Sequence, residues 1–138
     1  MGKSISELMT RDPRTVTTDS TVAEAARTMR DVDAGVIPIV EGERLVGVVT
    51  DRDIAVRVVA EGKDPQTTKV TEVASKDLVT IDPQQDLDEA LRLMAQHQVR
   101  RLPVVEEDGK LIGIVAQADV ATHAGGKKTG EVVEQISQ

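Results

Sequence analysis

The sequence of 138 residues contains no cysteine and no phenylalanine, tyrosine or tryptophan. Without cysteine, the chain forms no disulfide and offers neither a thiol nucleophile nor a thiolate ligand for a metal ion. Without aromatic rings, it lacks the side chains on which proteins usually stack the bases of single-stranded nucleic acid. The formal net charge of −7 also opposes binding to a phosphate backbone. These absences argue against a nucleic acid as a partner.

Long apolar runs are absent as well. Residues 1–4 lead into no apolar segment of the kind that a signal peptide needs. No run elsewhere in the chain approaches the length that crosses a bilayer. We therefore expect a cytoplasmic protein that has no membrane partner.

Histidine is scarce, since only His97 and His123 occur, and each falls near the end of a predicted helix. Neither has a serine or a carboxylate placed as a catalytic relay would require. Two isolated histidines without cysteine are also a weak indication of a metal site, whereas the helix dipole favours histidine at a helix end. We expect no catalytic residue and no bound metal, which makes an enzyme the least favoured class of function.

Two copies of one pattern make up most of the chain, the first over residues 15–54 and the second over residues 78–120. The offset between matched positions drifts from 63 to 66 residues, and each shift falls in a turn, where insertions are tolerated. An internal repeat of this kind indicates a fold built from two similar units. The matched pairs include Val16 and Val79, Pro38 and Pro103, Gly47 and Gly113, and Asp53 and Asp119.

Each copy predicts the same order of elements, β-α-β-β-α. A short extended segment, over residues 15–18 or 78–81, precedes a helix with one apolar stripe. Two strands joined by a turn follow, over residues 36–50 or 102–115, and a second helix ends the copy. A segment of this size buries little core alone, so we expect an α/β (α+β) fold in which the two copies pack sheet to sheet. The stripes consist of Val22, Ala25, Ala26 and Met29, and of Leu87, Ala90, Leu91 and Met94.

The repeat divides the chain into a first motif with an N-terminal helical lead (residues 1–64), a second motif (residues 65–125) and a C-terminal tail (residues 126–138). The tail is polar but carries three β-branched apolar residues between positions 132 and 136. The sequence leaves open whether the tail is a frayed end or a short helix that docks on a partner chain.

A strand that ends in Thr50 runs directly into a helix that carries Asp53 in its first turn. Backbone N–H groups at a helix start attract anions and polar ligands, and a carboxylate there can accept two hydrogen bonds from the vicinal diol of a ribose. The same residues also fit a plain N-cap, in which Thr50 or Asp51 caps the helix and the dipole favours Asp53. The spacing alone supports both interpretations equally.

Two patterns recur in the same order in both copies: an apolar residue directly before a proline, and G-h-h-T/S-x-x-D, where h is an apolar residue and Ala116 replaces the hydroxyl residue in the second copy. On these motifs the chain resembles a CBS domain pair, or Bateman module, over residues 5–124. Its layout is also similar to stand-alone bacterial CBS-pair proteins of the hypoxic-response type. The resemblance implies that the two copies pack about a pseudo-twofold axis and form two clefts. It further implies that a cleft binds AMP, ADP, ATP or another adenosyl ligand, with no cofactor required.

In the first cleft, the resemblance assigns Thr50 and Asp53 to the ribose. It assigns Arg100 and Arg101 to the phosphates, and a guanidinium suits a phosphate because it offers several donors in one plane. Adjacent residues of a strand point in opposite directions, so a solvated strand edge is the alternative for the arginines. The base would lie against Val48, Leu78, Val79 and Val99.

The second cleft departs from this pattern. Asp119 keeps the carboxylate, but Ala116 stands where the first copy has a threonine. The counterparts of the two arginines are Gly35 and Val36, so no cation is supplied there. We expect this cleft to be empty or to bind a weaker and less charged ligand. Besides Asp119, its lining would consist of Thr15, Val16, Ala34 and Ile114.

The sequence favours a regulatory module that senses a small ligand, because a ligand bound across two copies favours one arrangement of them. The output would be an effector protein or a homodimer. Ile54, Val58 and Val59 of the second helix suit either a dimer contact or the core of their own copy. A structural or stress-associated dimer with vestigial nucleotide sites is the alternative function, and the altered second cleft supports it.

Overall fold

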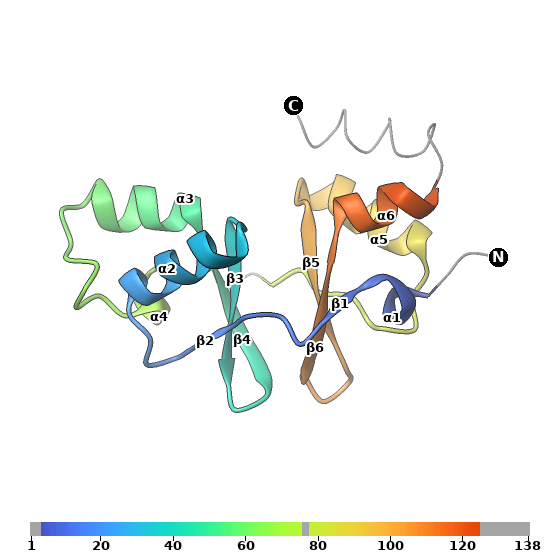
Figure 1. Ribbon diagram of the computed structural model, residues 1–138, viewed down its shortest axis with the longest axis horizontal. Coiled ribbons are helices and arrows are strands. Elements are labelled where there is room, and N and C mark those ends of the chain that lie inside the picture. The colour runs from blue at the N-terminus through green and yellow to red at the C-terminus, as the bar shows by residue number, and fades with distance from the viewer. Residues whose placement is uncertain (1–3, 76–77, 125–138) are drawn as a thin grey trace. The chain divides into compact units, whose positions relative to one another are not determined.

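The computed structural model describes residues 4–75 and 78–124 and shows a mixed α/β fold with two three-stranded sheets and several helices (Figure 1). The chain forms two compact units. The central unit is the continuous stretch Arg14–Leu78, and the split unit joins Met1–Pro13 to Val79–Gln138. Each unit has its own sheet and its own hydrophobic core. The expected mixed fold is confirmed, while the sheet-to-sheet packing of the copies stays a prediction.

The central unit contains β2 (Val16–Thr17), α2 (Val22–Val32), β3 (Val36–Glu41), β4 (Arg44–Thr50), α3 (Asp51–Ile54), the π-helix η1 (Ala55–Val59) and α4 (Val70–Val73). Its sheet has the order β2-β3-β4, with β2 parallel to β3 and β3 antiparallel to β4. The turn between β3 and β4 contains Gly42 with a φ of 65°, a conformation that glycine adopts at little steric cost.

One face of α2 lies in the core of the central unit. Val22, Ala25 and Met29 are buried there, as their spacing predicts. Ala26 was expected in the same stripe, but it is exposed, and Ala23 is buried instead. The buried face of α2 therefore contains the predicted stripe except for Ala26 and extends to Ala23.

The second helix of the first copy is α3 followed by η1. Val58 is fully buried in the core of the central unit, and Ile54 packs against that core. Val59 is 72% exposed and Val56 is 47% exposed. The sequence left open whether Ile54, Val58 and Val59 belong to a dimer contact or to the core of their own copy. Val58 and Ile54 contribute to that core, and Val59 lies at the surface.

The split unit contains α1 (Ile5–Leu8), β1 (Thr10–Arg11), α5 (Leu87–His97), β5 (Arg101–Val105), β6 (Leu111–Ala116) and α6 (Gln117–Ala124). Its sheet has the order β1-β6-β5, and both strand pairs are antiparallel. The extended segment expected over residues 78–81 is reduced to one parallel bridge, between Ile81 and Val104. The predicted stripe of α5 is buried, and it consists of Leu87, Ala90, Leu91 and Met94.

The lead (residues 5–11, α1 with β1) packs in the split unit, so it belongs with the second repeat although it precedes the first. Ile5 is fully buried there, and its N–H donates to the carbonyl oxygen of Gln85 over 2.8 Å. Strand β1 pairs with β6, with Thr10 opposite Ile114. Burial of apolar side chains stabilises this placement. The sequence division, which joined the lead to residues 14–64, differs from the observed packing at this point.

The segment before the second repeat is placed in the same way. Val70 of α4 is fully buried in the core of the central unit. Ser75 and Val48 of β4 exchange backbone hydrogen bonds of 3.1 and 3.4 Å. Residues 65–75 therefore pack with the first repeat, whereas the sequence division assigned them to the second motif. The tail, residues 126–138, lies outside the described residues.

The repeated glycines Gly47 and Gly113 lie where these leading segments approach the sheets. A Cβ atom on Gly113 would lie 2.9 Å from the carbonyl oxygen of Thr10 and 2.9 Å from Cγ of Met9. A Cβ atom on Gly47 would lie 3.4 Å from the carbonyl oxygen of Ser75. Both glycines thus give the neighbouring backbone room, and the fit is tighter at Gly113.

Candidate functional site

Thr50 and Asp53 join the end of β4 to the start of α3 through two reciprocal hydrogen bonds. The N–H of Asp53 donates to Thr50 Oγ1 over 3.0 Å, and the N–H of Thr50 donates to Asp53 Oδ2 over 3.0 Å. This capping box satisfies an N–H group that a helix start otherwise leaves free, so the N-cap interpretation is confirmed. Within the described part of the chain, Oδ1 of the half-buried Asp53 makes no hydrogen bond, so one carboxylate oxygen remains available for a ligand.

A second carboxylate, that of Asp51, lies beside Gly35 at the same helix start. The N–H of Asp51 donates to the carbonyl oxygen of Gly35 over 2.9 Å, and Asp51 Oδ1 accepts a hydrogen bond from the N–H of Arg52 over 2.8 Å. A Cβ atom on Gly35 would lie 2.7 Å from Asp51 Oδ2. With two carboxylates, this helix start suits a group that donates hydrogen bonds better than it suits a phosphate.

Arg100 and Arg101 lie at the corresponding place in the split unit, where β5 begins. The carbonyl oxygen of Arg100 accepts a hydrogen bond from the N–H of Gln117, the first residue of α6, over 2.7 Å. Arg101 stands opposite Ala116 in the register of β5 and β6. Arg100 is exposed and Arg101 is half-buried. Neither guanidinium makes a hydrogen bond or an ion pair with a described residue, so both remain available to an anion.

Asp119 has in α6 the position that Asp53 has in α3. Its Oδ2 accepts a hydrogen bond from the N–H of Ala116 over 3.1 Å, but Ala116 has no hydroxyl group to complete a capping box. The side-chain Nε2 atom of Gln117 is buried without a hydrogen-bond partner in the described residues. Gln117 was not among the residues predicted from the sequence, although its alignment with Asp51 in the repeat could have indicated it. The two helix starts thus differ in charge and in capping.

The apolar residues assigned to the base fall into two groups. Val79 and Val99 pack, partly buried, against the core of the split unit. Val48 and Leu78 are half-buried residues of the central unit. The first group shares its unit with the two arginines, and the second shares its unit with the capping box at the start of α3. Each group of residues lies within a single unit. That the two groups together form one nucleotide site stays a prediction.

The residues assigned to the second cleft are also divided between the units. Val16 is buried in the central unit, and Ala34 is half-buried there. Ile114 and Asp119 are half-buried residues of the split unit. A second site built from these residues likewise stays a prediction.

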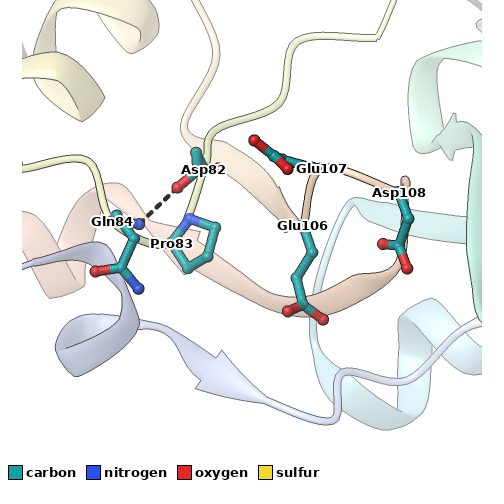
Figure 2. Close-up of a pocket in the computed structure, with 6 residues that line it drawn as sticks. All are labelled: Asp82, Pro83, Gln84, Glu106, Glu107 and Asp108. Carbon is teal, nitrogen blue, oxygen red and sulfur yellow. Dashed lines mark hydrogen bonds between the residues drawn. The ribbon is translucent and has the colours of Figure 1, made fainter.

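A pocket of about 570 Å³ opens in the split unit, where the turn after β5 lies beside the segment before α5 (Figure 2). Within it, Asp82 Oδ1 accepts a hydrogen bond from the N–H of Gln84 over 2.8 Å. The pocket carries four carboxylates and none of the residues predicted to bind a nucleotide, so its charge opposes a phosphate. Its lining consists of Asp82, Pro83, Gln84, Glu106, Glu107 and Asp108.

The scarce histidines take no part in these groups of residues. His97 is the exposed last residue of α5, and the side chain of His123 lies outside the described part. Among residues 4–75 and 78–124, no cluster of three or more histidine and acidic side chains is placed to hold a metal ion. Over the same ranges, no helix combines the length and the hydropathy needed to cross a membrane.

Comparison with known proteins gives consistent matches over most of the chain. The family model for the CBS domain matches residues 5–60 and 70–126. CBS domain-containing protein YhcV of Bacillus subtilis is 44% identical over 135 residues, which cover 97% of this chain and 95% of that protein. Both matches therefore extend over the two copies of the repeat.

Solved structures show the same fold. A crystal structure of Hypoxic Response Protein I with two coordinated zinc ions is similar with a TM-score of 0.81 and 38% identity, covering 88% of this chain and 98% of that one. The CBS domain pair of protein MJ0100, in complex with 5′-methylthioadenosine and S-adenosyl-L-methionine, has a TM-score of 0.77 and covers 87% of this chain. Its identity is 23%, so this second likeness concerns the fold alone.

Proposed function

The chain belongs to the CBS domain family and carries two CBS domains, and on this premise we propose that it is a regulatory module that binds an adenosine-containing nucleotide such as AMP, ADP or ATP. The proposal assigns the ribose to Thr50 and Asp53 and the phosphates to Arg100 and Arg101. The observation that carries it is the pair of guanidinium groups that make no hydrogen bond or ion pair with a described residue. Two neighbouring cations without an acidic partner suit a phosphate group.

The capping box supplies the chemistry that a ribose needs. Asp53 Oδ1 is a carboxylate oxygen that can accept hydrogen bonds from the two hydroxyl groups of the sugar. Thr50 Oγ1 already accepts a hydrogen bond from the N–H of Asp53, so the hydroxyl proton of Thr50 is available for the ligand. Because the helix start fixes both side chains before the ligand binds, less conformational entropy is lost on binding.

The proposal includes one strong nucleotide site in each chain rather than two. A charge-assisted hydrogen bond contributes about 1.5–3 kcal/mol. The second set of residues has Gly35 and Val36 in place of both arginines. Loss of two such bonds would weaken phosphate binding by about a hundredfold or more.

The output of the module would be a change in the arrangement of its two units. A ligand that contacts residues of both units shifts their equilibrium by its difference in affinity for the two arrangements. The proposal places the protein in the cytoplasm, gives it no catalytic step, and makes an effector protein or a homodimer the recipient of the signal.

Calorimetric titration with AMP, ADP, ATP and S-adenosyl-L-methionine tests the proposal. Asp53→Asn keeps an acceptor for the N–H of Thr50 but removes the charge, and Arg101→Gln removes one cation. Each should weaken nucleotide binding by about tenfold or more. The matched controls Asp119→Asn and Arg30→Gln, the latter on the exposed face of α2, should change the affinity by less than about threefold. Equal losses from Asp53→Asn and Asp119→Asn would refute the single-site assignment.

A structural or stress-associated dimer with vestigial nucleotide sites is the second candidate function. The exposed Val56 and Val59 on η1 favour it, because exposed apolar side chains are suited to contact between proteins. This function predicts a dimer whose melting temperature does not respond to any of the four ligands. A dimer that Val59→Lys dissociates, together with an absence of heat on titration, would support it over the sensor.

A further inference from the structure

The lead is joined to the central unit by a residue in an unfavourable backbone conformation. Asp12, which follows β1, has a φ of 50°, in the left-handed region that residues other than glycine seldom adopt. Pro13 comes next, and a proline restricts the residue before it to extended conformations because the ring collides with its backbone and Cβ. The joint at Asp12 therefore carries backbone strain.

The lead is held firmly on the other side of this joint. Ile5 is fully buried, and Leu8 and Met9 are only 9% and 8% exposed. The N–H of Ser6 donates to the carbonyl oxygen of Pro83 over 3.0 Å. Strand β1 adds an edge strand to β6. These contacts, made by residues 5–11 on the split unit, compensate for the strain that follows at Asp12.

We propose that two copies of this chain exchange leads, so that residues 5–11 of each copy occupy the split unit of the other. The contacts of the lead are the same in the closed and the exchanged forms, so they do not decide between the two. The forms differ in the conformation of Asp12, which can become extended when the joint opens, and in the entropy lost on association. Strained hinge segments favour exchange of this kind, and the exchanged dimer gains population as the protein concentration rises.

This association is independent of nucleotide binding. It needs none of the residues that the proposed function assigns to the ribose or the phosphates, and it leaves both hydrophobic cores complete. The partner is a second copy of the same chain, because the complementary surface for the lead is the split unit itself.

Crosslinking between two single-cysteine variants tests the exchange, and the absence of natural cysteines makes the chain a clean background. Thr10 and Ile114 face each other in the register of β1 and β6. The Cα–Cα distance between facing residues of antiparallel strands lies in the range that a disulfide spans. A Thr10→Cys chain is mixed with an Ile114→Cys chain that carries a C-terminal size tag. The mixture is refolded together from urea at several concentrations, oxidised, and resolved on a non-reducing gel.

Exchange predicts a covalent heterodimer that exceeds both homodimers and increases with protein concentration. In closed chains the two cysteines lie on different molecules and do not face each other. The residue at position 12 should control the yield. Asp12→Gly accepts a positive φ without strain and should lower the heterodimer by about fivefold. Asp12→Pro cannot adopt it and should raise the heterodimer at every concentration.

The proposal is overturned if the heterodimer stays no more abundant than the homodimers at every concentration, including in the Asp12→Pro background. It is equally overturned if the heterodimer forms but its yield is the same with Asp, Gly and Pro at position 12, since the joint then has no influence. If Asp12→Pro shows no cooperative unfolding, the comparison of Asp12→Gly with the natural residue decides alone.

Discussion

The N–H of Ala116 donates to the side chain of Asp119 over 3.1 Å, which is one half of the bond pair that Thr50 and Asp53 make in full. The missing half requires only a hydroxyl group at position 116. Ala116→Thr should therefore stabilise the chain by about 1 kcal/mol, and Thr50→Val should destabilise it by about the same amount. Urea unfolding measures both changes.

The control for this pair is Ala116→Val, which has the shape of threonine without its hydroxyl group. It should give none of the gain, because the capping bond is what stabilises the helix start. If the valine and threonine variants at position 116 are equally stable, the capping interpretation of α6 is wrong.

The two repeated glycines should respond differently to alanine. At Gly113 a Cβ atom meets backbone at 2.9 Å, while at Gly47 the nearest backbone atom is 3.4 Å away. Forcing an extra methyl group into a filled space typically costs about 1–3 kcal/mol. Gly113→Ala should fall in this range and Gly47→Ala below it, as measured by urea unfolding. The reverse order would show that the lead does not approach β6 as closely as described.

Ile5 should be important for the stability of the split unit although it lies close to the N-terminus. Its side chain is fully buried beside the residues of α5, and truncation of such a residue to alanine costs about 2–5 kcal/mol. In Ile5→Ala, hydrogen exchange should accelerate in Leu87–His97, while the amides of β3 and β4 keep their protection. Arg30→Gln, at an exposed position of α2, is the control and should leave both patterns unchanged.

The ion pair of the half-buried Glu89 and the exposed Arg92 in α5 predicts a pH dependence. Hydrogen bonds of 2.7 and 2.8 Å from Arg92, with a smaller contribution from its charge, hold the pKa of the Glu89 carboxyl below its ordinary value. A carboxyl group with a lowered pKa contributes stability above its unfolded-state pKa, and this contribution is lost as the pH falls through the lowered value.

NMR titration should thus find a higher pKa for Glu89 in the Arg92→Gln variant than in the natural chain. The difference should shrink at high salt, because both side chains lie at the surface. An unchanged pKa of Glu89 in the variant would mean that the pair does not persist in solution.

Much of the fold follows from local patterns in the sequence. The buried residues Val22, Ala25 and Met29, and the hairpin turn at Gly42, are set by spacing and turn chemistry, which act over a few residues. The capping box at Thr50 is equally local. These features could be read from the sequence because neighbouring residues alone determine them.

The placement of the lead, and of residues 65–75 before the second repeat, could not be predicted in this way. Nothing in the residues around Ile5 shows whether this helix packs on the first repeat, which follows it directly, or on the second repeat. Both repeats offer similar surfaces. The proposed nucleotide site presents the same difficulty. Thr50 and Asp53 are placed by their own helix start, whereas the proposed partnership with Arg100 would depend on contacts between distant parts of the chain.

The division into a continuous and a split unit has a consequence for synthesis on the ribosome. The central unit is complete once Leu78 has left the exit tunnel, so it can fold while translation continues. The lead is synthesised before the central unit but finds its core only after β6 has been made. Until then Ile5, Leu8 and Met9 remain accessible to chaperones and proteases, so the lead is protected later than the central unit that follows it in the chain.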